Sequence, residues 1–111
     1  MQCVSVGPVG PVKPLPRWGH TANLICNPNS GERGLYVFGG HGGDQSSHLN
    51  DVRKFDLDTS EWSKVAVKGT PPCPRDSHTA TTVGLRLFIF AGTDGNTPLD
   101  DLYIFDTARE L

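Results

Sequence analysis

The sequence predicts an all-β protein built from consecutive antiparallel sheets, and three observations support this fold class. The chain repeats one series of motifs twice in the same order, at spacings that fall from 58 residues (His20 to His78) to 50 (Phe55 to Phe105). Short β-branched and aromatic segments recur between turns, as strands require. Glycine (13) and proline (9) are frequent among the 111 residues, while 36% of the chain is hydrophobic. A repeat of this length with several strands per copy is typical of a radial or stacked array of sheets.

Three pairs of motifs carry the duplication. They are Pro16-Arg17-Trp18-Gly19-His20 with Pro74-Arg75-Asp76-Ser77-His78, Leu35-Tyr36-Val37-Phe38-Gly39-Gly40 with Leu87-Phe88-Ile89-Phe90-Ala91-Gly92, and Leu49-Asn50-Asp51-Val52 with Leu99-Asp100-Asp101-Leu102. The spacing shortens after the first pair because the first copy has a longer hairpin, Asn27–Gly34, where the second has only Gly84. Insertions of this kind collect in surface loops.

Seven strands are expected from the pattern of apolar residues and turns. They cover residues 18–25, 34–40, 51–57, 61–67, 77–84, 86–92 and 101–106. Both Leu35–Phe38 and Leu87–Phe90 are apolar on each face, which predicts that other sheets cover them on both sides. Gly84 and Asp94-Gly95 are expected to form hairpin turns with positive φ.

Composition limits the compartment and the partners. The formal net charge is −2 and no basic patch stands out, so neither nucleic acid nor a membrane is an expected partner. The first residues show no secretory signal, and the apolar runs are too short to span a bilayer. Three cysteines without paired spacing favour a reducing compartment, either the cytoplasm or the nucleus.

In these motifs the sequence resembles the kelch repeat. The resemblance rests on Pro-Arg-x-x-His at 16–20 and 74–78, on the apolar strand that ends in Gly39-Gly40, and on Thr59 followed by Trp62. It covers residues 16–111 and implies antiparallel four-stranded blades of a β-propeller, here incomplete with about two blades. The implied organisation is a Pro/Gly-rich lead-in (1–15), a first repeat (16–73) and a second repeat (74–111) that is truncated before its last strand.

Ten residues at repeated or signature positions are expected to serve the scaffold: Arg17, His20, Gly39, Gly40, Asp51, Trp62, Arg75, His78, Gly92 and Asp101. The arginines and histidines are expected to tie the loops of one blade to the next. The aspartates are expected to precede strands and to bond backbone N–H groups. The glycines are expected to turn with positive φ, and Trp62 to lie between adjacent sheets. Ala91 replaces a glycine in the second copy, and a methyl group is expected to be tolerated there if that φ is negative.

The step from Phe55 to Trp62 places the next large core residue of the second copy just past Leu111. Propellers close with about four to eight blades. We therefore expect a piece of a longer propeller, whose open strand edges take additional blades or self-associate.

Polar loops are the expected contact surface for another protein. The candidate loops cover residues 41–50 and 93–100, with Asn27–Arg33 as an insertion on another turn. The residues expected to contact the partner are His41, Asp44, His48, Asp94 and Asn96. The expected function is a non-catalytic protein–protein interaction module of kelch type, with no catalytic residue and no cofactor.

A metal-dependent enzyme is the alternative. His41, Asp44 and His48 offer three metal ligands on one loop, although the second copy has no histidine there. The resemblance extends to propeller oxidases with copper and to iron-assisted specifier proteins. The sequence contains neither a recognisable copper constellation nor the Glu-x-x-x-Asp-x-x-x-His spacing of specifier proteins.

Overall fold

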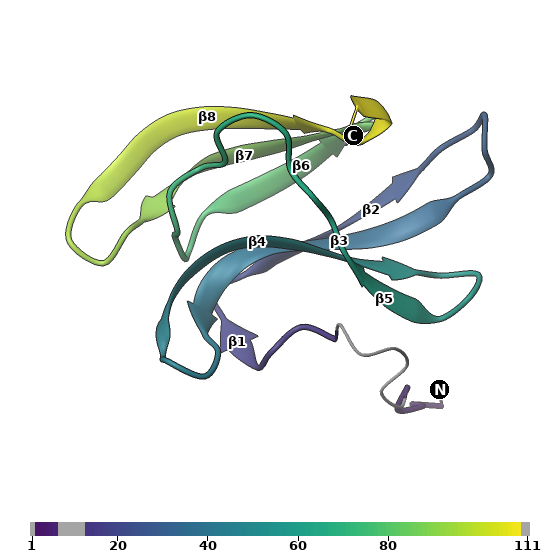
Figure 1. Ribbon diagram of the computed structural model, residues 1–111, viewed down its shortest axis with the longest axis horizontal. Helices are drawn as coiled ribbons and strands as arrows, with labels where there is room; N and C mark the ends of the chain where they lie inside the picture. The colour runs from purple at the N-terminus through teal and green to yellow at the C-terminus, as the bar shows by residue number, and fades with distance from the viewer. Residues whose placement is uncertain (1, 7–12, 110–111) are drawn as a thin grey trace.

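The computed structural model describes residues 2–6 and 13–109, which form two antiparallel sheets packed against each other (Figure 1). The first sheet contains β1 (Arg17–Trp18), β2 (Thr21–Cys26), β3 (Arg33–Gly42), β4 (Ser47–Asp56) and β5 (Glu61–Lys64). The second contains β6 (Thr79–Val83), β7 (Arg86–Thr93) and β8 (Pro98–Asp106), followed by the short 3-10 helix η1 (Thr107–Arg109). The predicted all-β class and its antiparallel blades are confirmed. Within the described residues, no helix is long and apolar enough to cross a membrane.

Both sheets follow one plan. In the first sheet β1 and β2 pair with successive parts of β3, which pairs with β4, and β4 pairs with β5. The second sheet has the order β6-β7-β8, and an isolated bridge between Asp76 and Thr93 stands where Trp18 pairs with His41 in the first. The repeated sequence motifs therefore occupy equivalent places in two sheets.

The strand ends differ from the sequence prediction. β3 and β7 continue past β-bulges at Phe38/Gly40 and Phe90/Gly92 and pair further with β4 and β8. The segments 41–50 and 93–100, expected as loops, are therefore mostly strand, and only 43–46 and 94–97 are turns. Conversely, residues 65–67 are not strand. They leave the first sheet, and the side chains of Val65 and Val67 pack against the core between the sheets.

The core lies between the two sheets. Its buried side chains come from the first sheet (Ile25, Tyr36, Phe38, Val52) and from the second (Leu87, Ile89). The prediction that Leu87–Phe90 is covered on both faces is wrong, because Phe90 is 49% exposed. Only the face of β7 that carries Leu87 and Ile89 meets the first sheet.

The condition stated for Ala91 is not met, since its φ is +62°, close to the +66° of its counterpart Gly39. The two positions differ in their surroundings. A Cβ atom on Gly39 would lie 2.9 Å from His78 Cε1 and 3.0 Å from the carbonyl oxygen of Arg75, both in the segment that leads into β6 of the second sheet. The packing of the second sheet thus requires glycine at position 39, whereas a methyl group is present at position 91.

Replacing Ala91 with glycine is expected to stabilise the chain by about 0.5 kcal/mol. Left-handed backbone costs alanine about 1–2 kcal/mol, and the greater freedom of glycine in the unfolded chain offsets about 0.4–1 kcal/mol of that gain. Gly39→Ala is expected to destabilise by about 1–3 kcal/mol because strain and crowding coincide. Urea unfolding of both variants checks this. Equal effects at the two positions would contradict the difference in packing.

Candidate protein-interaction surface

Two arginines brace the ends of the sheets. Arg17 donates from Nη1 to Asp51 Oδ1 (2.7 Å) and from Nη2 to Oδ2 (3.1 Å), and Arg75 makes the same pair of bonds to Asp101 (2.6 and 2.8 Å). Each guanidinium also donates to a carbonyl at the β-bulge of its own sheet: Arg17 to that of Gly39 and Arg75 to that of Ala91. These side chains therefore stabilise single sheets and do not tie one blade's loops to the next. The aspartates lie within β4 and β8, not before these strands as expected, and their carboxylates accept from the guanidinium groups.

These contacts keep both carboxylates ionised. Hydrogen bonds from Arg75 lower the pKa of Asp101 and outweigh the opposing effect of burial. For Asp51 burial is the largest influence and raises the pKa, but hydrogen bonds and charge from Arg17 and Arg53 together bring it below its usual value. The braces thus stabilise the fold above the pKa of unfolded aspartate and weaken as the pH falls through the lowered values.

The side chain of His78, which immediately precedes β6, contacts the first sheet. Its Nε2 lies 2.9 Å from Thr21 Oγ1, and the ring stands edge-on to Phe38 with 5.0 Å between centroids. Nearby backbone bonds run from Gly40 N to Arg75 O (2.8 Å) and from Ser77 N to Gly19 O (2.9 Å). The counterpart of His78 in the first copy, His20, is exposed.

The stability of the chain is expected to fall as the pH drops below about 6.5, partly because of His78. Burial and then the charge of Arg75 lower the pKa of His78 in the folded chain. On acidification the unfolded chain therefore takes up this proton first, and the free energy of unfolding decreases. His78→Gln removes this contribution, while the exposed His20→Gln retains it. Urea unfolding of both variants at about pH 7.5 and pH 5.5 measures the difference. If the free energy of unfolding fell equally on acidification in the two variants, His78 would be excluded as a source of the pH dependence.

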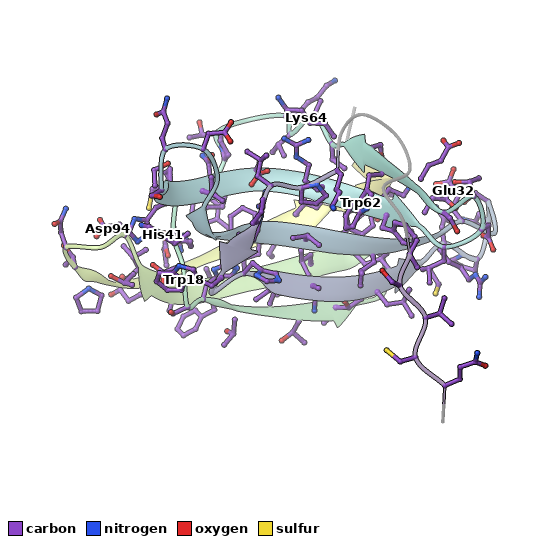
Figure 2. All side chains as sticks on the ribbon, turned by 90° about the horizontal axis from the view of Figure 1, so that it is seen from below. Trp18, Glu32, His41, Trp62, Lys64 and Asp94 are labelled. Carbon is purple, nitrogen blue, oxygen red and sulfur yellow. The ribbon has the colours of Figure 1, made fainter. Side chains whose placement is uncertain are left out.

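One end of the molecule carries a cluster of rings that joins both sheets. The Trp18 ring stacks on His41 (centroids 5.0 Å apart, planes at 29°), and His41 meets the His48 ring edge-on at 4.7 Å. His48 Nε2 in turn lies 2.6 Å from Asp76 Oδ1, which precedes the second sheet. Figure 2 shows Trp18, His41 and Asp94 at this end and Glu32 at the opposite end. We call this end the rim: Trp18, His41, His48, Asp76 and the turns 43–46 and 94–97.

The predicted contact residues fall into different settings on the rim. His41 and His48 form one register pair of β3 and β4. Asp94 Oδ1 accepts from the backbone N–H groups of Asn96 and Thr97 (both 2.9 Å), and these bonds lower the pKa of Asp94. This carboxylate is therefore engaged in its own turn. Asp44 and Asn96 are exposed on the two neighbouring turns.

Sequence reasoning missed Trp18 and Asp76 as rim residues. Both occupy the first variable position of the Pro-Arg-x-x-His motif, where the two copies differ. That difference between the copies could have indicated a contact role, because a position whose residue type the scaffold does not determine can bind a partner. Trp18 is 60% exposed, whereas Asp76 is buried beneath His48.

The geometry gives no support to a metal centre. His41 and His48 touch through their rings, while Asp44 lies on the exposed turn beyond them. Across residues 2–6 and 13–109, no three His, Cys, Asp or Glu side chains are grouped so that they can hold a metal ion. The alternative of a metal-dependent enzyme therefore rests on no feature of this rim.

The opposite end carries the inserted hairpin. The Asn27 side chain accepts from the backbone N–H groups of Asn29 and Ser30 and closes this turn locally. Trp62 lies on β5 and packs on Phe55 of the adjoining strand (5.1 Å between centroids). This contact lies within the first sheet, in contrast to the expected position between sheets.

Comparison with known proteins identifies the family. The sequence matches the model of the KLHDC2/KLHL20/DRC7 Kelch-repeats domain over residues 2–110. Host cell factor 2 from Homo sapiens is 46% identical over 81 residues, which cover 73% of this chain and 10% of that protein. Rab9 effector protein with kelch motifs from Bos taurus is 38% identical over 97 residues, covering 83% of this chain and 24% of that protein.

Acyl-CoA-binding domain-containing protein 5 from Arabidopsis thaliana is 36% identical over 94 residues, which cover 84% of this chain and 13% of that protein. The chain spans about a quarter or less of the length of these three relatives. The family match extends over nearly the whole chain, and both sheets place the repeated motifs at equivalent positions. The chain therefore belongs to the kelch-repeat family.

Proposed function

We propose that the chain is a non-catalytic protein-interaction module whose rim contacts another protein. Its family membership supports this class of function, and one relative is named as an effector of Rab9. The two sheets form a rigid support on which the short turns 43–46 and 94–97 are presented. Such turns on a fixed scaffold are common sites of recognition.

Trp18 is the observation that carries this proposal. It exposes 60% of its surface, yet it rests on His41, which contacts His48, which is paired with Asp76. Tryptophan is enriched among residues that dominate binding energy. A ring that is already held in place loses little conformational freedom on binding. The exposed Asp44 and Asn96 provide polar groups around this anchor.

The partner that suits this surface presents a flat apolar side chain or a guanidinium group to Trp18. Both stack on an indole face, and a cation gains further from the ring electrons. Polar groups around that side chain would meet the exposed turns. We therefore propose a contact of moderate affinity centred on one aromatic anchor.

Trp18→Ala is expected to weaken binding at least about tenfold, as loss of an interface anchor does. The probe is a set of peptides selected from a displayed random library against the intact chain. Asn29→Ala, on the inserted hairpin at the opposite end, is the control and should leave binding unchanged. Peptides that bind the Trp18 variant as tightly as the parent chain, but lose affinity for the Asn29 variant, would place the contact at the other end.

The cytoplasm or the nucleus is the compartment we propose. Cys3, Cys26 and Cys73 are all free thiols on exposed residues. Exposed free thiols persist in reducing compartments.

A further inference from the structure

We propose that Thr70 is a phosphorylation site for a proline-directed protein kinase and that its phosphate binds Lys68. Both residues lie in the connector, the segment 65–74 that leads from β5 towards β6 without strand or helix (Figure 1). A kinase of this class transfers phosphate to a serine or threonine that directly precedes proline, and Pro71 follows Thr70. This modification is additional to the contact proposed at the rim, and none of its tests involves Trp18.

The connector holds Thr70 in a form that a kinase can bind. A proline disfavours helical backbone in the residue before it, so Pro71 keeps Thr70 extended, and Pro72 does the same for Pro71. Residues 68–71 are all exposed. Gly69 has a φ of +80°, and a Cβ atom added there would meet nothing within 4 Å beyond its chain neighbours. The acceptor is therefore presented on an extended, uncovered stretch of backbone.

The connector is anchored on both sides of Thr70. Val65 N donates to Val52 O (3.0 Å), and Asn50 Nδ2 donates to Pro72 O (3.1 Å). Among the residues that the structure describes, Thr70 itself makes no hydrogen bond. A kinase can therefore engage this hydroxyl while both anchors stay in place.

The second Thr-Pro pair of the chain, Thr97-Pro98, has the opposite setting. Thr97 N donates to Asp94 Oδ1 (2.9 Å), and Thr97 O accepts from Thr93 Oγ1 (3.1 Å). Pro98 is the first residue of β8. Binding of this pair in extended form would break the turn, and a phosphate would add negative charge beside the Asp94 carboxylate. The fold therefore favours Thr70 over Thr97.

The repeat does not require a Thr-Pro pair in the connector. Arg75 is the counterpart of Arg17, 58 positions earlier, and the same spacing aligns Thr70-Pro71 with Val12-Lys13 in the first copy. The pair thus belongs to the second copy alone. Its residue types are available for a role beyond folding.

The transfer step forms one bond and breaks one. Thr70 Oγ1 attacks the γ-phosphorus of ATP, the bond from this phosphorus to the bridging oxygen breaks, and ADP leaves. The hydroxyl proton passes to the aspartate base of the kinase. The product adds about −1.5 to −2 charges at pH 7 to the exposed connector.

Lys68 is the cation that is placed to bind this phosphate. Lys68 and Thr70 line the same cavity of about 230 Å³ beside β8, and within the described part of the chain Lys68 has no ion-pair partner. Asp106 also lines this cavity. Its Oδ1 accepts from Ala108 N (3.0 Å), and its Oδ2 lies 3.5 Å from Arg86 Nε. The Asp106 carboxylate is therefore engaged elsewhere, and the Lys68 ammonium is left for the phosphate.

Phosphorylation of the full chain by an active mitogen-activated protein kinase with ATP tests the site, with mass spectrometry of proteolytic fragments as the readout. The parent chain should take up a single phosphoryl group, located on Thr70. Thr70→Ala and Pro71→Ala should lose this incorporation, whereas the matched variants Thr97→Ala and Pro98→Ala should keep it. No incorporation in the parent chain would overturn the proposal. Incorporation on Thr97 as fast as on Thr70 would also overturn it, because the fold would then not select the connector.

Phosphorus NMR of the phosphorylated chain tests the partner of the phosphate. The second pKa of a phosphothreonine is ordinarily about 6, and a nearby ammonium lowers it because it favours the dianion. Lys68→Gln should therefore raise the pKa of the phosphate relative to the phosphorylated parent chain. Lys64→Gln, at the exposed last residue of β5, is the control and should leave this pKa unchanged. The same pKa in the parent chain and in both variants would exclude Lys68 as the partner.

Discussion

Phe38→Ala is expected to lower the free energy of unfolding by about 3–5 kcal/mol, whereas Phe90→Ala should lower it by less than about 1 kcal/mol. The two phenylalanines occupy equivalent positions of the repeat. Phe38 is enclosed between the sheets and touches the His78 ring, while half of the surface of Phe90 is exposed. Only the first substitution therefore leaves a cavity.

Urea unfolding of the two variants and of the parent chain measures both losses. The repeat itself supplies the control, since the two positions share their residue type and strand environment. Similar losses for the two variants would mean that the second sheet does not pack over Phe38.

Arg75→Met is expected to destabilise the chain by about 3 kcal/mol, near the lower end of the range for broken buried ion pairs because Asp101 is partly exposed. The Arg75 side chain is fully buried and donates to Asp101 and to the carbonyls of Cys73 and Ala91. Methionine retains much of the volume but leaves these acceptors without their donor.

Arg86→Met is the control for this substitution. Arg86 Nε lies 3.5 Å from Asp106 Oδ2, and the Arg86 side chain is largely exposed. Its loss should therefore change the free energy of unfolding by about 0.5 kcal/mol or less. Chemical unfolding at neutral pH compares the two variants. A loss at Arg75 as small as that at Arg86 would contradict its role as the brace of the second sheet.

The fold could be predicted because the strand pattern is local and is present twice. Period-two segments, hairpin turns at Gly84 and Gly95, and the repeated Pro-Arg-x-x-His motif together define the sheets. The strand ends at the rim could not be predicted in the same way. The bulge at Gly39-Gly40 interrupts the alternation of side chains, and a sequence pattern cannot show that pairing resumes beyond it.

The roles of single polar residues depended on tertiary contacts. Nothing in the local sequence indicates that Asp51 would accept from Arg17, because 34 positions separate them. The positive φ of Ala91 was missed for a related reason. Alanine normally avoids this region, and its presence reflects the absence of a neighbouring sheet over that position among the described residues.

The candidate contact surface was predicted in outline only. Polar turns at both ends of each sheet are evident in the sequence, and His41 and His48 do lie together. The anchor Trp18 was missed because it belongs to a motif whose arginine and histidine indicated a scaffold role. Trp18 is the last residue of the two-residue strand β1 and pairs with His41 near the end of β3, where its ring is exposed.

Nuclear Overhauser contacts between side chains of the two sheets test the central claim most directly. Proximity of the Phe38 ring to His78, and of the Tyr36 ring to Phe105, is predicted from centroid distances of 5.0 and 6.2 Å. The Phe90 ring should show contacts only within its own sheet. A spectrum in which Phe38 contacts neither His78 nor any other residue of the second sheet would contradict the two packed kelch blades.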